Sequence, residues 1–211
     1  MKRVINLDNW NRKEHFKFFS ALDDPFWGIT TTVDFTSIYQ QSKNMEVSFF
    51  LYSAHFLLKC INATTAFKLR IENGEVVEYD KINISPTIGR EDGTFGFGFF
   101  EYDTDLSLFI ENAEKEIHRV KNSTGLSFSK DTARADVIRY SALPWFAFSE
   151  MKHAGSIQTG DSIPKISTGK LIQEKKKLLL PISISVHHGL VDGRNVAEFI
   201  QNVKDGQNNT L

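Results

Sequence analysis

Two hydrophobic periods alternate along the chain, and together they predict a mixture of helices and strands. In 104–120 and 193–204, apolar residues recur every three or four positions, which is typical of amphipathic helices. The segment 48–62 is apolar apart from a narrow polar stripe that includes His55, so we predict a largely buried helix there. A shorter helix is predicted over 11–20.

Strand patterns occupy much of the remaining chain. Aromatic and β-branched residues predict strands at 26–35, 93–103 and 136–148. The dipeptide Asn73-Gly74 lies between two further strand-like runs and suits a type I′ turn, so we expect a hairpin there. The segment 164–188 contains two more strands joined by a charged turn. The whole pattern predicts an α+β fold with a mixed, largely antiparallel sheet and helices packed on it.

The composition fits a single globular domain that spans residues 1–211. A chain of 211 residues can bury a sizeable core. Its net charge of −1 gives no electrostatic case for binding nucleic acid or an anionic membrane. The 18 phenylalanines exceed what a core alone needs, which favours an aromatic-lined pocket or a subunit interface.

Cysteine content and hydropathy indicate a reducing, aqueous environment. Cys60 is the one cysteine and lies in an apolar run, so we expect a buried reduced thiol rather than a nucleophile. The first residues lack the apolar core of a signal peptide. No stretch approaches the roughly 18 apolar residues that a membrane-spanning helix needs. We therefore expect a cytoplasmic protein.

The segment SISVHHGLVDG at 183–193 combines the end of an apolar strand with two adjacent histidines and an aspartate. Because side chains alternate between the faces of a strand, His187 continues a row of serines and His188 continues the apolar row. The two imidazoles therefore cannot serve one reacting atom. We expect His188 to act as a neutral base near physiological pH and His187 to take a hydrogen-bonded structural role.

Three kinds of site can be considered for this histidine pair. The simplest is structural, with Asp192 as the N-cap of the last helix, where its carboxylate accepts from free amides. A zinc site is disfavoured, and no metal is expected, because the other histidines form no ligand spacing with the pair: His15, His55, His118 and His153. A Ser-His-Asp hydrolase is disfavoured because no G-x-S-x-G motif is present.

Short motifs distributed over nearly the whole chain resemble one acyltransferase family. The residues HHGLVDG fit the H-H-x-x-x-D-G signature that chloramphenicol acetyltransferases share with dihydrolipoamide acyltransferases. The chloramphenicol acetyltransferase family is indicated by NWNRKEHFKFF at 9–19, FKLRIENGEVVEYD at 67–80, SALPW at 141–145 and STGK at 167–170. The lipoyl-carrying and linker regions usual in the other family have no counterpart here. The resemblance implies the chloramphenicol acetyltransferase fold and acetyl-CoA as co-substrate.

The resemblance assigns three residues to the chemistry. His188 matches the general base, which would take the proton of a substrate hydroxyl as its oxygen attacks the thioester of acetyl-CoA. Ser141 matches the serine that donates a hydrogen bond to the oxyanion. Ser167 stands where the family commonly has a threonine that supports the transition state through water. These roles suit the reaction, because an alcohol is a poor nucleophile without a base and developing charge needs a preorganised donor.

Three further residues would hold the active-site turn in place. The resemblance pairs Asp192 with Arg12 in a buried ion pair, so that Asp192 braces the turn and does not relay charge to a histidine. It also leaves His187 with a structural role. Loss of either partner of such a pair is expected to damage folding and activity together.

The resemblance also implies a homotrimer with each active site at a subunit boundary, where one chain supplies the histidine and its neighbour most of the acceptor pocket. The residues expected to line that pocket are Phe19, Phe26, Thr94 and Phe128. Phe19 stands where the family often has a tyrosine, so a hydroxyl is lost. Asp23 and Asp24 depart from the usual sequence at the pocket mouth.

Three functions are compatible with these residues. The first is O-acetylation of chloramphenicol in a ternary complex with acetyl-CoA, which would give antibiotic resistance. The second is the same chemistry on another small hydroxylated molecule. The third is a catalytically idle binding protein of the same fold, and the joint presence of His188, Ser141, Arg12 and Asp192 argues against it.

Overall fold

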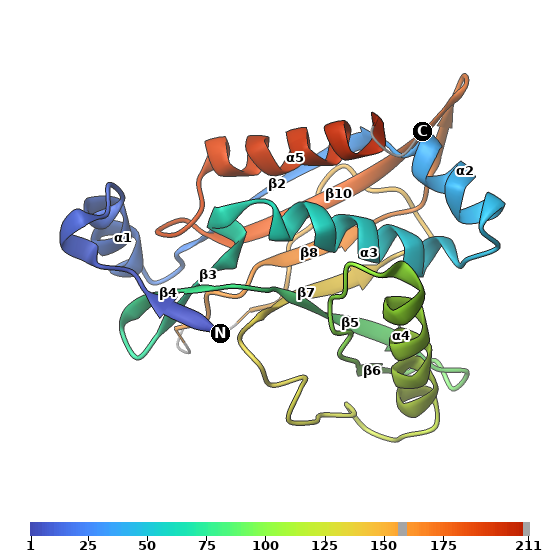
Figure 1. Ribbon diagram of the computed structural model, residues 1–211, viewed down its shortest axis with the longest axis horizontal. Coiled ribbons are helices and arrows are strands. Elements are labelled where there is room, and N and C mark those ends of the chain that lie inside the picture. The colour runs from blue at the N-terminus through green and yellow to red at the C-terminus, as the bar shows by residue number, and fades with distance from the viewer. Residues whose placement is uncertain (156–159, 209–211) are drawn as a thin grey trace.

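The structure, a computed structural model, describes residues 1–155 and 160–208, among which lie five α-helices and ten strands (Figure 1). The helices are α1 (Lys13–Ser20), α2 (Thr36–Asn44), α3 (Phe49–Asn62), α4 (Leu106–Lys121) and α5 (Gly193–Asn208). The strands are β1 (Lys2–Val4), β2 (Phe26–Asp34), β3 (Leu69–Glu72), β4 (Glu75–Tyr79), β5 (Asn83–Gly89), β6 (Phe95–Phe97), β7 (Val137–Ala142), β8 (Lys165–Thr168), β9 (Ile172–Glu174) and β10 (Lys177–His187). Two short 3-10 helices are Leu7–Asn9 and Thr65–Lys68.

Two β-sheets organise the described chain. The larger has seven strands in the order β2-β10-β8-β7-β5-β6, with β9 paired to β10, and the smaller has the order β1-β4-β3. The pairs β5–β7 and β7–β8 are parallel, and the other strand pairs are antiparallel. The predicted α+β class, with a mixed and largely antiparallel sheet, is confirmed.

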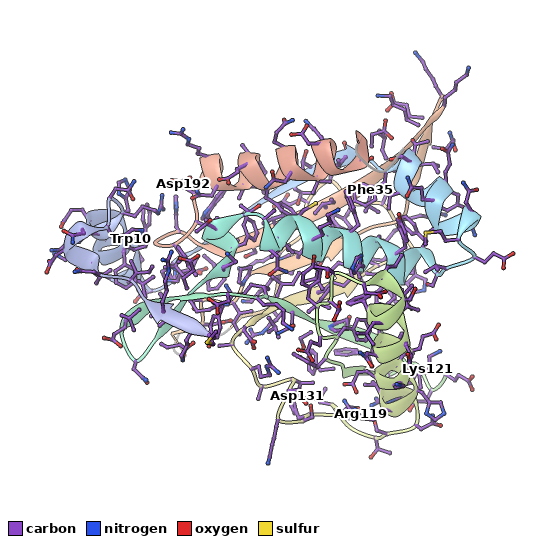
Figure 2. All side chains as sticks on the ribbon, in the orientation of Figure 1. Trp10, Phe35, Arg119, Lys121, Asp131 and Asp192 are labelled. Carbon is purple, nitrogen blue, oxygen red and sulfur yellow. The ribbon has the colours of Figure 1, made fainter. Side chains whose placement is uncertain are left out.

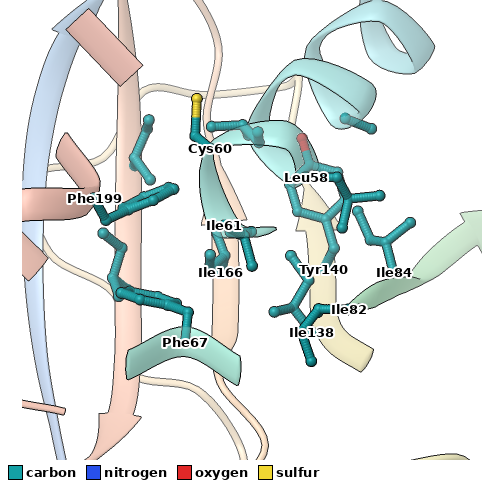
Figure 3. Packing of buried hydrophobic residues seen from close by; sticks show 14 of the residues in the cluster. Leu58, Cys60, Ile61, Phe67, Ile82, Ile84, Ile138, Tyr140, Ile166 and Phe199 are labelled. Carbon is teal, nitrogen blue, oxygen red and sulfur yellow. The ribbon is translucent and has the colours of Figure 1, made fainter. Parts of the chain in front are cut away.

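Helices α3, α4 and α5 pack on one face of the larger sheet. In Figure 1, α5 lies along β2 and β10, α3 crosses the middle of the sheet, and α4 lies beside β5 and β6. Figure 3 shows the apolar side chains between these layers, with Phe199 of α5, Ile61 of α3 and Ile166 of β8, all three fully buried. Burial of each such side chain stabilises the fold by roughly 1.5–3 kcal/mol. On the opposite face of β8 and β10, Ser183 is aligned with Ser167 and Ser185 with Lys165, so this part of the face is polar.

The helix predictions are confirmed for α1, α3, α4 and α5, but the sequence pattern missed α2. Its nine residues, TSIYQQSKN, are mostly polar, and only Ile38 and Ser42 are buried. So little apolar surface gives almost no periodic signal. A local sign of its start is Asp34, whose carboxylate accepts hydrogen bonds from the amide and hydroxyl of Thr36.

The hairpin at Asn73-Gly74 is confirmed, with φ of 51° and 81° at the two turn residues. The strand predicted over 93–103 was too long, because pairing ends after β6. Beyond Phe97 the Gly98 amide still donates to the carbonyl oxygen of Pro86 at 2.9 Å, but Pro86 has no N–H to donate in return, so the ladder is interrupted there. An isolated bridge joins Phe100 to β5 farther along.

Two other strand predictions need correction. The strand predicted over 136–148 ends at Ala142, two residues before Pro144. The two strands predicted over 164–188 are three, because the chain leaves the ladder after Thr168 and pairs with β10 again only as β9. The charged turn between β9 and β10 is present, and Lys175 has a φ of 52° there.

Cys60 lies within α3, and its thiol is buried and free of any disulfide. Burial raises its pKa to about 12, so the thiol is protonated at physiological pH. The prediction of a reduced, unreactive cysteine is confirmed.

Candidate active site

The two histidines at the end of β10 contact different residues. His187 pairs with Phe26 of β2, and the His188 amide donates to the carbonyl oxygen of Pro25 at 2.8 Å. The rings of His187 and Phe26 are 5.9 Å apart, whereas the ring of His188 lies 5.3 Å from that of Trp27. Because Phe26 and Trp27 are consecutive in a strand, they point to opposite faces of the sheet. The two imidazoles follow them to opposite sides.

His187 is buried against the turn that follows it. Its side chain is 4% exposed, and its Nδ1 accepts the Gly189 amide at 3.1 Å. A Cβ at Gly189 would lie 3.0 Å from the His187 ring and 3.3 Å from the Phe16 backbone, so glycine permits this close approach. Burial lowers the pKa of His187 to about 4, which leaves the ring neutral at physiological pH. These contacts suit a structural role.

Aromatic packing, and not a hydrogen bond, orients the His188 ring. Phe19 stacks on it with centroids 3.9 Å apart and an angle of 21°, and Trp27 lies on it at 40°. Within the described chain, the buried Nδ1 of His188 has no hydrogen-bond partner. Trp27 is fixed in turn, because its indole N–H donates to the carbonyl oxygen of Val191 at 2.9 Å. The rings of Phe19 and Trp27 therefore hold the His188 imidazole in place.

Arg12 and Asp192 connect the two ends of the chain beneath this turn. One guanidinium nitrogen of Arg12 donates to the Asp192 carboxylate, and another donates to the carbonyl oxygen of His188 at 3.1 Å. The side chains are 15% and 34% exposed, so the pair is partly buried and not fully buried as predicted. The arginine thus fixes both the aspartate and the backbone of His188.

Asp192 also caps helix α5, at whose start it lies in Figure 2. Its Oδ1 accepts from the amides of Arg194 and Asn195 at 2.9 and 3.1 Å. Burial favours a higher pKa for Asp192, but the Asn195 amide and the Arg12 guanidinium outweigh burial and lower it. The carboxylate is therefore charged at physiological pH and serves as both helix cap and ion-pair partner.

A row of five hydroxyl side chains crosses the polar face of the larger sheet. The strand registers align Thr30 with Ser183, Ser183 with Ser167, and Ser167 with Ser141. The Thr87 hydroxyl extends the row from β5 and donates to Ser141 Oγ at 3.2 Å. Residues aligned across neighbouring strands point to the same face. We call this set the hydroxyl row: Thr30, Ser183, Ser167, Ser141 and Thr87.

The structure brings Ser141 and Ser167 together but places His188 elsewhere. His187, at the end of β10, is four residues beyond Ser183 of the hydroxyl row. Four strand residues span about 13 Å, and the two strand spacings from Ser183 to Ser141 add about 10 Å. Within one chain, His188 and Ser141 therefore cannot contact one substrate hydroxyl together.

A cavity of about 690 Å³ lies on the polar side of β2, β8 and β10. Among the residues that line it are Phe26, Met151, His153, Asp161, Lys165 and His187. Lys165 is 6% exposed, and its Nζ lies 4.3 Å from the Phe26 ring centroid and 3.4 Å from the Asp161 carboxylate. Of the expected acceptor residues, Phe26 therefore lines this cavity, while Phe19 packs on His188.

Of the other two expected acceptor residues, Phe128 lies beside the hydroxyl row and Thr94 does not. Phe128 is 70% exposed and stacks on Phe97 of β6 at 5.4 Å. Phe97 pairs with Thr87, which donates to Ser141, so Phe128 is close to the hydroxyl row. Thr94 is exposed in the turn between β5 and β6.

Within residues 1–155 and 160–208, no three His, Cys, Asp or Glu side chains are arranged to hold a metal ion. His55 Nε2–H donates to the carbonyl oxygen of Asp103 at 2.8 Å, and His118 is exposed on α4. None of the helices in that part of the chain has the length and apolar character needed to cross a membrane.

The sequence pattern missed three residues that hold the site. Trp27 packs on His188, Thr87 donates to Ser141, and His153 Nε2 lies 2.9 Å from Ser167 Oγ. The alternation of serines along β10 was a signal for a polar face, but it could not show which strands align. No local pattern marks His153, because its contact depends on the path of an irregular segment.

Solved acyltransferases share this fold. A probable dihydrolipoamide acetyltransferase from Listeria monocytogenes is 13% identical and superimposes with a TM-score of 0.69, over 98% of this chain and 94% of that one, which shows the fold alone. A solved chloramphenicol acetyltransferase is 29% identical, with a TM-score of 0.90 over 98% of this chain and all of the other.

The particular family follows from the sequence of the whole chain. Residues 2–204 match the family model of chloramphenicol acetyltransferase, and the chain belongs to this family. Chloramphenicol acetyltransferase 3 of Escherichia coli is 27% identical over 208 residues, which is 98% of this chain and 97% of that protein. The chloramphenicol acetyltransferase of Clostridioides difficile is 29% identical over 207 residues, covering 95% and 93%. The resemblance predicted from the motifs is confirmed.

Proposed function

We propose that this protein uses acetyl-CoA to acetylate a hydroxyl of chloramphenicol. The observation that carries the proposal is the family match over residues 2–204, with relatives of that name along nearly the whole chain. The chain would form one acetyltransferase domain that acts in the cytoplasm. Resistance to the antibiotic would be the consequence.

The proposed reaction is direct transfer in a ternary complex. The His188 imidazole takes the proton of the acceptor hydroxyl, whose oxygen forms a bond to the thioester carbonyl carbon. The carbon–sulfur bond then breaks, and the leaving thiolate takes the proton from the imidazolium. Ser141 donates to the oxyanion, which is supported by the bond from Thr87, because a serine oxygen that already accepts keeps its own proton free to donate.

The proposed active assembly is a homotrimer in which one chain supplies His188 and its neighbour Ser141 and Ser167. The separation of these residues within one chain supports this proposal. So do the exposed apolar side chains of Phe128, Trp145 and Phe146, at 70%, 73% and 54% exposure. Strand β2 is also an edge of the larger sheet, which leaves a row of backbone groups for another chain.

A second acceptor class is favoured by the cavity. Lys165 and Asp161 put charge, and His153 a polar ring, beside Phe26. Phe19 has no hydroxyl to offer an acceptor. A small hydroxylated molecule more polar than chloramphenicol would suit these side chains.

The test is thiol release from acetyl-CoA with chloramphenicol, with a panel of other alcohols, and with no acceptor. Turnover that requires chloramphenicol supports the first function, and turnover with other alcohols alone supports the second. Inactivity with every acceptor, despite trimer formation by light scattering, would leave an idle binding protein of this fold.

A further inference from the structure

The His153 side chain lies between Ser167 and the cavity. Its hydroxyl is fully buried, at 0% exposure, and its Oγ lies 2.9 Å from Nε2 of His153. His153 is half-buried and lines the cavity. If Ser167 stabilises a reacting group from this position, the direction of its hydroxyl proton depends on its hydrogen-bond partner, His153.

The hydrogen-bond inventory of the two side chains limits their arrangement. A neutral imidazole has one N–H and one lone pair, and a hydroxyl has one proton. Burial and the positive charge of Lys165 lower the pKa of His153, so the ring is neutral at physiological pH. Either Ser167 donates to Nε2 and has no proton left, or Nε2–H donates to Ser167 and leaves its proton free.

The second arrangement agrees with the surroundings of the ring. Nδ1 of His153 is buried and has no hydrogen-bond partner in the described chain. A buried N–H without an acceptor is costlier than a buried lone pair without a donor, and only Nε2 has a hydrogen-bond partner among the described residues, so the lone pair is favoured on Nδ1. The proton then lies on Nε2, which faces Ser167.

Ser141, the neighbouring serine, also has a hydrogen-bond donor behind it. Ser141 accepts from Thr87 at 3.2 Å and so keeps its proton to donate. Ser141 and Ser167 are aligned in adjacent parallel strands. Two neighbouring hydroxyls would then point their protons into one site, each held by a donor behind it.

We propose that His153 is a positioning residue for acyl transfer, whose Nε2–H donates to Ser167 Oγ and directs the Ser167 proton toward the negative charge that develops on the reacting oxygen. The bond from Ser167 is direct or passes through one water. This inference rests on the proposed acetyl transfer, and it assigns a role to a histidine that forms no motif in the sequence.

Three substitutions separate this role from simple packing. In His153→Gln, the side-chain amide can place an N–H near the position of Nε2. His153→Leu fills similar space without a donor, and His153→Asn has a donor that is too short to reach. We expect kcat to fall about tenfold in the Leu and Asn variants and to stay within about threefold of wild type in the Gln variant.

The matched control is His118, which is exposed on α4 and outside the site. His118→Leu should leave kcat unchanged, and near-native melting of each variant shows that it folds. Ser167→Ala supplies the second test. If His153 acts through Ser167, adding His153→Leu to the Ser167→Ala variant should lower kcat by less than about a further twofold.

The possible results distinguish a failure of the positioning role of His153 from a failure of the proposed function. Equal kcat in all His153 variants, or an undiminished effect of His153→Leu in the Ser167→Ala background, would overturn the positioning role and leave the proposed function standing. No wild-type turnover with any acceptor would overturn the proposed function. In that event ¹⁵N NMR of the His153 ring decides the inference, because a proton on Nδ1 contradicts it and a proton on Nε2 supports it.

Discussion

The residues around His188 and the residues of the hydroxyl row are held in place by different interactions. Around His188, an ion pair between Arg12 and Asp192 and the packing of two aromatic rings fix an irregular turn. In the hydroxyl row, strand register alone aligns the side chains, and the hydrogen bond from Thr87 to Ser141 joins two neutral groups. The first arrangement depends on a few specific contacts, whereas the second is part of the sheet.

This difference has a consequence for how each region responds to substitution. The turn at His188 is connected to distant parts of the sequence, so the loss of one contact releases both the turn and the start of α5. The hydroxyls of Ser141 and Ser167 project from a backbone that other residues stabilise. We therefore expect loss of the Arg12–Asp192 contacts to change stability and activity together, and loss of a hydroxyl in the second region to change activity alone.

The largest expected effect is that of His188→Ala. Loss of the proposed base should lower kcat about 10³-fold, while the fold remains because the ring makes no hydrogen bond through Nδ1. Stopped assays of thiol release, together with thermal melting, measure both. Acetyl transfer within tenfold of wild type would exclude His188 as the base.

Ser141→Ala should have the next largest effect. Removal of an oxyanion donor typically lowers kcat about 10²-fold, and here KM and the melting temperature should change little. Ser183→Ala is the matched control, because Ser183 belongs to the same hydroxyl row but lies outside the proposed machinery. Similar losses in both variants would show that the row acts only through packing.

Asp192 allows the ion pair and the helix cap to be separated. Asp192→Asn keeps a carbonyl oxygen for the amides of Arg194 and Asn195 and removes the charge that pairs with Arg12. We expect it to destabilise the fold by about 1–2 kcal/mol, since the pair is partly buried, and to lower kcat as well. Asp192→Ala should lose about 1 kcal/mol more, the usual value of an N-cap.

Chemical denaturation with kinetics on the same samples measures these effects. If Asp192→Asn lowered kcat without any loss of stability, Asp192 would act in the chemistry and not as a brace.

At physiological pH the smallest effect is expected from the protonation of His187, because its effect on stability appears only as the pH falls below 6.5. The folded-state pKa of His187 is about 4 against an ordinary value of 6.5, so the unfolded chain binds a proton first as pH falls. The stabilisation is complete above pH 6.5 and is lost as pH falls toward 4, up to about 3 kcal/mol. His187→Asn keeps an acceptor for the Gly189 amide and should flatten this slope. An unchanged slope in urea titrations between those pH values would contradict the assignment.

Much of the base region could be predicted from the sequence, because its parts are local. The strand end, the turn and the start of α5 follow one another within 183–200, and strand alternation separated His187 from His188 in advance. Arg12 was found by resemblance and not by pattern, since a contact over 180 positions leaves no periodic signal. That the pair is partly exposed also needed the structure.

The hydroxyl row could not be predicted in the same way. Ser141, Ser167 and Ser183 lie in three separate strands, and hydrophobic period does not determine which residues align across a sheet. The short β6 shows the same limit, because the residue that interrupts its ladder, Pro86, belongs to another strand. His153 lies in an irregular segment, where neither period applies.

The central claim is that one chain provides the base and a second chain the hydroxyls, and mixed trimers test it most directly. His188→Ala and Ser141→Ala chains, each nearly inactive alone, are denatured, mixed in equal amounts and refolded together. With one site at each boundary of a symmetric trimer, random assembly restores both groups in about a quarter of the sites. The account predicts recovery of about one quarter of wild-type thiol release. Activity no higher than the mean of the two separate variants, in trimers shown to be mixed, would contradict it.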